Sequence, residues 1–249
     1  MGFDIVIGRP HYSQSREKEK YGHKMAKRLL AHVSLCVILL VAVSVNMASA
    51  CSCMMSHPQT HACRADFVIV ARVKKVLVRD LMSRVYKVKI KREFKMSEKA
   101  SVLLKSGRLV TAGTSSMCGV DLRPEETYLI TGKVVAGQAS INLCNYITPW
   151  TDLTVRQKKG FRLLYRQGCL CEITDCPWWR RCPKESLMAE SCLWETSINS
   201  DSSLPDCQAN HGICMKTPSG NCGWSTDKKY RECMKNRRRI RDEKLRKEP

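Results

Sequence analysis

The chain has 249 residues and carries 43 Lys and Arg against 23 Asp and Glu, a formal net charge of +20 at pH 7. Its 15 cysteines are typical of a secreted, disulfide-bonded protein and argue against a cytosolic enzyme. Strong basicity on an exported chain favours sulfated glycans or acidic protein surfaces as partners. Export itself argues against nucleic acid as the partner.

The first 50 residues have the pattern of an export signal. Residues 33–45 are almost entirely apolar, which is about the length of a signal h-region and short for a membrane span. The small residues 48–50 (Ala-Ser-Ala) then form a signal-peptidase site, so cleavage would make Cys51 the mature N-terminus. Met25, which opens a short basic stretch, is an alternative initiator. We therefore assign residues 1–50 to a removed signal segment and expect the mature protein in the extracellular space and matrix.

Cleavage at this site makes the cysteine count even. Cys36 leaves with the signal, and fourteen cysteines remain, enough for seven disulfides in an oxidising compartment. The removed segment contains seven basic and three acidic residues, so the mature chain of 199 residues keeps a charge of +16.

Five β-strands are expected between residues 65 and 145. In chain order they are 67–78, 86–91, 101–110, 127–135 and 140–144. Segment 86–91 is the clearest, because its apolar and basic residues alternate with period two. Gly137-Gln138 suits a hairpin between the last two strands, and Gly132 is a candidate for a bulge or bend. Five such strands fit a closed barrel of the oligonucleotide/oligosaccharide-binding (OB) type.

A helix and a second domain are expected after the barrel. The helix is predicted from residue 152 to about 164 with Thr151 as its N-cap, because Pro149 argues against an earlier start. From Cys169 to Cys233, nine of 65 residues are cysteine, which is typical of a disulfide scaffold. The predicted fold class is therefore mainly β: a five-stranded OB-fold barrel with a flanking helix, followed by a small disulfide-rich C-terminal domain.

The chain ends in a strongly basic stretch. Residues 235–247 contain eight Lys and Arg. Such a run is either a solvated tail or a glycan-binding tail, and the sequence leaves both readings open.

The C-x-C at the mature terminus has chemical consequences of its own. Cys51 and Cys53 in an extended segment point the same way, and a direct bond between them would be strained, so each should find a distant partner. A terminal cysteine also offers its α-amino nitrogen and its carbonyl oxygen side by side. This pair can close a five-membered chelate on a metal ion.

Several motifs occur in a fixed order along the mature chain. They are Cys51-Ser52-Cys53, His57-Pro58-Gln59-Thr60 before Cys63, Cys118-Gly119, Tyr128-Leu129-Ile130-Thr131-Gly132-Lys133, Pro149-Trp150, Arg156-Gln157-Lys158-Lys159-Gly160-Phe161 and Cys192-Leu193-Trp194. In this series the chain resembles the tissue inhibitors of metalloproteinases, whose first domain is a netrin-like OB barrel.

The resemblance implies a domain organisation and a disulfide pattern. Residues 51–169 would form the inhibitory domain, 170–234 the disulfide-rich C-terminal domain and 235–249 a basic tail. The implied pairs are Cys51–Cys118, Cys53–Cys144, Cys63–Cys169, Cys171–Cys222, Cys176–Cys182 and Cys192–Cys214. Elimination then leaves Cys207 to pair with Cys233.

The resemblance also implies a function, which is stoichiometric inhibition of zinc endopeptidases of the matrix metalloproteinase and disintegrin-metalloproteinase kind. The Cys51 amine and carbonyl would replace the water on the protease's zinc, so inhibition should weaken in mild acid. The protein would be no enzyme and would have no catalytic residue and no cofactor of its own. The implied protease-binding residues are Cys51, Ser52, Cys53, Met54, Ser115, Ser116, Met117 and Cys118, with Arg64 as a lesser candidate.

The chain departs from the family pattern at several points. One residue separates Cys169 from Cys171 where two are usual, Met54-Met55 replaces the common Val and Pro, Ser52 stands where Thr is frequent, and the loop near Asp80 is short. These changes leave the expected chelate intact, but they put the range of target proteases in question.

Other functions compete with this interpretation. A netrin-like module that binds extracellular glycans or proteins without inhibiting a protease is the main alternative, and a free Cys51 discriminates against it. A zinc site at His57 and His61 is disfavoured because Pro58 argues against the helix that would align them. The cysteine spacings do not match zinc-finger ligation, and an even cysteine count argues against a nucleophilic thiol.

Overall fold

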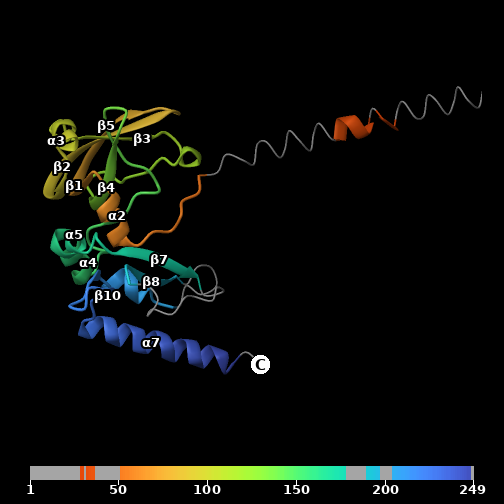
Figure 1. The fold of residues 1–249 in the computed structure, drawn as a ribbon. Coiled ribbons are helices and arrows are strands. Elements are labelled where there is room, and N and C mark those ends of the chain that lie inside the picture. The colour runs from red at the N-terminus through yellow and green to blue at the C-terminus, as the bar shows by residue number, and fades with distance from the viewer. Residues whose placement is uncertain (1–28, 31, 37–50, 178–188, 197–203, 248–249) are drawn as a thin grey trace, which may run out of the picture. The chain divides into compact units, whose positions relative to one another are not determined.

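The computed structural model describes residues 29–30, 32–36, 51–177, 189–196 and 204–247. The chain divides into two compact units, residues 1–50 and 51–249. Within the described parts, no helix is both long and apolar enough to cross a lipid bilayer. The helices and strands of the second unit are drawn in Figure 1.

The first half of this unit is a closed five-stranded barrel, which confirms the predicted fold class. Its strands are β1 (Phe67–Arg79), β2 (Ser83–Met96), β3 (Arg108–Ala112), β4 (Thr127–Val135) and β5 (Gln138–Ser140). The hydrogen-bonded order is β1-β2-β3-β5-β4, and β4 pairs back onto β1 to close the barrel. A short strand, β6 (Ile147–Pro149), pairs with β4 at residues 128–130.

Two of the expected strands differ from the observed ones. In segment 101–110 only residues 108–110 are in a strand, and residues 101–104 are helical, because α3 (Glu98–Leu104) begins after Ser97, whose side chain accepts a hydrogen bond from the Ala100 N–H. Ala100 and Leu104 are both buried and are spaced i, i+4, which is the period of a helix. Segment 140–144 contributes only its first residue to β5, and the rest forms a turn before β6.

Side chains of alternating strand residues fill the barrel, as the period-two pattern predicts. The fully buried members include Phe67, Ile69, Tyr86, Leu109 and Ile130. Tyr86 is anchored by its hydroxyl group, which donates to the Val120 carbonyl at 2.9 Å.

Gly132 lies where β4 leaves β1 and begins to pair with β5. The β1–β4 register has no shift up to Gly132, the last residue of β4 that pairs with β1. Of the two predicted alternatives the bulge is therefore wrong and the bend stays a prediction; the register shifts lie in the β1–β2 pairing. A Cβ atom at Gly132 would stand 2.2 Å from Phe67 Cζ. The glycine is required here because an aromatic ring packs directly on the backbone.

A second apolar cluster covers the outer face of β1 and β4. It combines strand residues such as Val68 and Leu129 with Phe161 and Tyr165 from the helical segment, and with Ile213 from the C-terminal half. The helical elements are α2 (Pro58–Arg64), α4 (Val155–Lys159), the π-helical turn η2 (Gly160–Leu164) and α5 (Tyr165–Gln167). In Figure 1 they lie between the barrel and the C-terminal elements.

The helix after the barrel begins later than the sequence predicts. Thr154, and not Thr151, is its N-cap: the Thr154 hydroxyl accepts from the Gln157 N–H, and the Gln157 side chain accepts from the Thr154 N–H. These two reciprocal hydrogen bonds form a capping box, which needs Gln157 three residues after the capping threonine.

The C-terminal half is built from short elements joined by disulfides. They are β7 (Glu172–Pro177) paired in parallel with β8 (Ser191–Thr196), α6 (Cys207–His211), β9 (Cys214–Lys216) paired with β10 (Cys222–Trp224), and α7 (Lys228–Leu245). The basic stretch expected from residue 235 lies mostly within α7, which starts seven residues earlier.

The contact at Gly132 gives a stability prediction. Replacement Gly132→Ala should lower the free energy of unfolding by about 1–3 kcal/mol, because the new methyl group collides with the Phe67 ring and the core must shift. Gly137→Ala is the control, since space there is open and only the positive φ of 71° opposes a side chain. Urea unfolding of both variants should give the larger loss for Gly132→Ala, and an equal or smaller loss would contradict the assignment.

Candidate functional site

Two disulfides fix the segment at the start of the second unit. Cys51 is bonded to Cys118 and Cys53 to Cys144, with Cα–Cα distances of 5.1 and 5.2 Å. The sulfurs of Cys51, Cys53 and Cys144 lie within 4.8 Å of one another. Because all three are oxidised, they offer no thiolate for a metal ion. The residues of this segment have no regular secondary structure, so cross-links hold them in place.

The loop that receives Cys51 is itself tightly hydrogen-bonded. It contains the 3₁₀ turn η1 (Ser115–Met117), and Cys118 follows with a left-handed φ of 63°. The Gly119 N–H donates to the Thr114 carbonyl at 2.8 Å, and the Leu143 N–H donates to the Cys118 carbonyl at 2.9 Å. The disulfide therefore joins the terminal segment to a loop whose backbone is already ordered.

Together the two segments form an exposed ridge. We define the contact ridge as residues 51–54 and 115–118, the positions that the resemblance implies. Met54 is 89% exposed and Met117 40% exposed, and four of the other six residues are also exposed. Large apolar side chains held in solvent on a cross-linked loop are a typical feature of a protein-binding surface.

A shallow hollow adjoins the ridge. It is lined by Cys53, Met54, Met55, Ser56, His61, Leu143, Cys144 and Asn145. Burial lowers the pKa of His61, so its imidazole is neutral at pH 7. The hollow thus presents apolar and uncharged groups next to the ridge.

The structure adds a neighbour that the sequence analysis missed. The β1–β2 hairpin exposes Leu81 and Met82 at its tip, at 79% and 75% of their surfaces, and the Gly113 N–H donates to the Met82 carbonyl at 3.1 Å. Asp80 shapes the turn by accepting the Met82 N–H at 2.9 Å. Two adjacent apolar residues in a polar turn could have indicated a binding surface from the sequence alone. Their position beside loop 114–118, however, depends on the long-range bond between Gly113 and Met82.

Arg64 does not line the hollow beside the ridge. It is exposed at the end of α2 and borders a different hollow, which Cys63, Cys169, Leu170 and Glu172 also line. No residue borders both this hollow and the one beside the ridge.

His57 anchors the chain just after the ridge. Its Nδ1 accepts the Gln59 N–H at 3.1 Å, and its Nε2 lies 3.0 Å from the Gln208 carbonyl. A carbonyl oxygen can only accept, so Nε2 carries the proton and the ring is neutral. The ring also lies 5.4 and 5.2 Å from the rings of Trp194 and Trp224.

The expectation that Pro58 disfavours a helix here is wrong. Pro58 is the first residue of α2, where a missing N–H costs nothing, and His57 is the N-cap. Both nitrogens of His57 are engaged within the protein, so they are not free to bind zinc together with His61.

Gln59 makes a second anchor in α2. Its side-chain amide donates to the Gly168 carbonyl at 3.1 Å and to the Cys214 carbonyl at 2.7 Å, and its oxygen accepts the Cys214 N–H at 3.0 Å. The residue is 1% exposed, so these bonds satisfy a buried amide. The base of the ridge is thereby tied to the C-terminal half of the protein.

The remaining disulfides join elements far apart in the sequence. The bonded pairs are Cys63–Cys169, Cys171–Cys222, Cys192–Cys214 and Cys207–Cys233. Cys176 is also disulfide-bonded, and its expected partner Cys182 lies outside the described residues. Five of the six pairs that the resemblance implies, and the Cys207–Cys233 pair expected by elimination, are thus present among the described residues.

These features define a class: an OB-barrel protein with a disulfide-pinned contact ridge and a small cross-linked C-terminal half. A profile of the tissue inhibitor of metalloproteinase family matches residues 49–224. The chain is 35% identical over 219 residues to "Tissue inhibitor of metalloproteinase" from Drosophila melanogaster, covering 84% of this chain and 99% of that protein.

Vertebrate relatives give similar values. "Metalloproteinase inhibitor 3" from Scyliorhinus torazame is 35% identical over 72% of this chain and 82% of its own length, and "Metalloproteinase inhibitor 2" from Rattus norvegicus is 35% identical over 75% and 86%. The chain belongs to the tissue inhibitor of metalloproteinase family.

The buried His57 makes stability depend on pH. Desolvation lowers its pKa to about 4 in the folded protein, against about 6.5 in an unfolded chain. Between pH 6.5 and 4, His57 is protonated in the unfolded state but stays mostly neutral in the folded state. The free energy of unfolding should therefore fall by up to about 3 kcal/mol between pH 6.5 and 4, as followed by urea unfolding across this range.

The matched variant is His57→Asn, which keeps an N-cap acceptor but has no titrating ring. It should be less stable at pH 7 and should have a weaker pH dependence. Some dependence will remain, because burial also lowers the pKa values of His61 and His211. A slope as steep as that of the wild type would contradict the assignment.

Proposed function

We propose that the mature chain is a secreted, stoichiometric inhibitor of zinc metalloendopeptidases, of the matrix metalloproteinase and disintegrin-metalloproteinase kind. The observation that carries this proposal is the Cys51–Cys118 disulfide, which fixes Cys51 beside the exposed loop 115–118. The names of the relatives, which are metalloproteinase inhibitors, support the class of target.

In this proposal removal of residues 1–50 exposes the Cys51 amine. A neutral amine and the Cys51 carbonyl oxygen would then displace the water from the zinc of the protease, and with it the nucleophile of peptide hydrolysis. The zinc belongs to the target, so the inhibitor needs neither a catalytic residue nor a cofactor. Ser52 would point into the pocket beside the metal.

The remaining contacts would come from the rest of the ridge and its neighbour. Met54 and residues 115–117 flank Cys51, and the hairpin tip with Leu81 and Met82 extends this surface. Disulfides and backbone bonds order the ridge before it docks, and such rigidity lowers the entropic cost of association. Arg64 borders another hollow, so we give it no role in zinc blockade.

In this proposal the two domains have different roles. Residues 51–169 would carry inhibition, and residues 170–234 would support the ridge through the partners of His57 and Gln59. The basic end of the chain, residues 235–249, would serve a different purpose.

Binding to heparin or other sulfated matrix glycans is a second property that we propose. The charge of +16 on the mature chain favours it, and so does the concentration of basic residues in α7. If inhibition were absent, this property would make the chain a netrin-like extracellular binding module.

Blocking the Cys51 amine tests the chelate. One extra alanine before Cys51, or acetylation of its amine, should abolish inhibition of a matrix metalloproteinase, because neither product presents a free α-amine on Cys51. Inhibition constants of the modified and unmodified mature protein are the measurement. Full potency in either product would refute the chelate.

Two controls accompany this test. Thermal unfolding should be the same with and without the extension, since Cys51 stays bonded to Cys118. Acetylation should be confined to the terminus by working near pH 7, where the α-amine reacts before lysine because its pKa is lower. Mass spectrometry can then confirm a single modified site.

A further inference from the structure

A groove runs between α7 and the strands β8 and β10. It has a volume of about 750 Å³. Its lining residues are Leu193, Glu195, Gln208, Trp224, Thr226, Tyr230, Arg231, Met234, Lys235 and Arg238. It has no lining residue in common with the contact ridge, so it is a second candidate binding surface.

One wall of the groove is a row of cations. Arg231, Lys235 and Arg238 are spaced i, i+4 and i+7 along α7, so they lie on one face of the helix. All three are exposed, and together they span about 10 Å of helix. None of them takes part in the ion pairs found among the described residues.

Two of the acidic residues near this row are already paired with cations outside it, and a third, Asp242, lines a neighbouring hollow with Lys235 and Arg238. Glu195 lies 3.6 Å from the Arg237 guanidinium, and Glu232 lies 3.9 Å from the Lys228 ammonium. We define the cationic row as Arg231, Lys235 and Arg238. Its positive charge is therefore available to a ligand in the groove.

The groove also has an aromatic component. Trp224 lines it, and the Trp224 indole N–H donates to the Leu193 carbonyl at 2.9 Å. Tyr230 and Met234 line it from α7. Flat apolar groups beside cations suit a ligand that has both apolar faces and anionic substituents.

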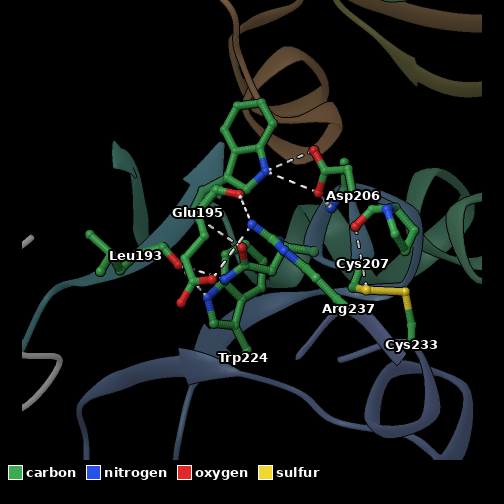
Figure 2. A network of polar contacts seen from close by, with 11 residues as sticks. Leu193, Glu195, Asp206, Cys207, Trp224, Cys233 and Arg237 are labelled. Atoms are coloured by element: carbon green, nitrogen blue, oxygen red, sulfur yellow. Dashed lines mark hydrogen bonds and ion pairs between the residues drawn. A yellow bond between two sulfur atoms is a disulfide. The ribbon is translucent and has the colours of Figure 1, made fainter. Parts of the chain in front are cut away.

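One disulfide and several part-buried polar contacts, which Figure 2 shows, fix the elements around the groove. The Cys207–Cys233 disulfide joins α6 to α7. The Arg237 guanidinium reaches back from α7 and donates to the Glu195 carbonyl at 3.0 Å. The Trp194 indole N–H donates to the Asp206 carboxylate at 3.1 Å. The row of cations thus stands on a helix that is fixed before any ligand binds.

We propose that this groove binds a sulfated glycosaminoglycan chain. Sulfate groups would pair with the cationic row, where the arginine guanidinium can hold two anionic oxygens at once. The apolar face of a sugar ring would pack on Trp224. An acidic peptide could satisfy the charges, but it offers no regular flat ring for the aromatic side chain, so the glycan is the better match.

This inference rests on the proposed glycan binding and locates it. It places the site in the middle of α7, at Arg231 and at two residues of the basic end, Lys235 and Arg238. It is independent of protease inhibition, because zinc blockade involves the contact ridge.

The test compares two triple variants of the full mature protein. The groove variant is Arg231→Gln, Lys235→Gln and Arg238→Gln. The control is Lys216→Gln, Lys229→Gln and Lys247→Gln, which removes the same charge at three exposed lysines outside the groove. The probes are heparin, fully desulfated heparin and poly-glutamate, and affinities are measured by titration at physiological ionic strength.

The groove variant should bind heparin about tenfold more weakly than the wild type, the combined effect of three exposed ion pairs. The control should lose about threefold or less, since its charges act at longer range through screening salt. Desulfated heparin and poly-glutamate should bind the wild type more weakly than heparin does.

Three results would overturn the inference: equal losses in the two variants, wild-type protein that does not bind heparin, or poly-glutamate binding that is as tight as heparin binding and is lost in the groove variant. The last result would identify an acidic peptide as the ligand. Both variants should inhibit a metalloproteinase as the wild type does. Failure of the groove is therefore distinguishable from failure of the inhibitor proposal.

Discussion

The constraint on which the candidate site depends is the covalent bond between Cys51 and Cys118. Residues 51–56 form no helix or strand, so hydrogen bonding alone would leave this segment free to adopt many conformations. The bond closes a large loop and removes much of that freedom. Because Cys53 is bonded to Cys144 as well, the segment is held at two points, and its exposed side chains form a surface with a defined shape.

The surface also needs a rigid base. His57 and Gln59 supply it by burying polar side chains among partners from the C-terminal half, Gln208 and Cys214. A buried amide or imidazole without its partners would cost free energy, so these bonds fix where α2 can lie. The two halves of the protein are therefore coupled mechanically, although the proposed zinc contact and the proposed glycan groove use different residues. Substitutions in one of the two proposed binding surfaces therefore need not change the residues of the other.

Sequence reasoning succeeded where a short-range pattern decides the structure. It predicted the observed bounds of β4, because residues 127–135 are rich in apolar and β-branched residues and lie between turns. The closed barrel followed from the number of strands. It failed where a contact between residues far apart in the sequence determines the local structure. The helical spacing of Ala100 and Leu104 outweighed the strand pattern around them. The roles of Gly132 and the hairpin tip depend on residues far away in the chain, and the groove beside α7 exists only after disulfides have joined separate segments.

In the proposed mechanism, the free Cys51 amine of each inhibitor molecule blocks the zinc of one protease molecule. Titration of a purified secreted matrix metalloproteinase with the mature protein tests it most directly, once mass spectrometry has confirmed Cys51 as the terminus. If each inhibitor molecule blocks one zinc, protease activity should fall linearly and reach zero at one equivalent. Activity that persists at several equivalents, across a representative panel of metalloproteinases, would contradict it.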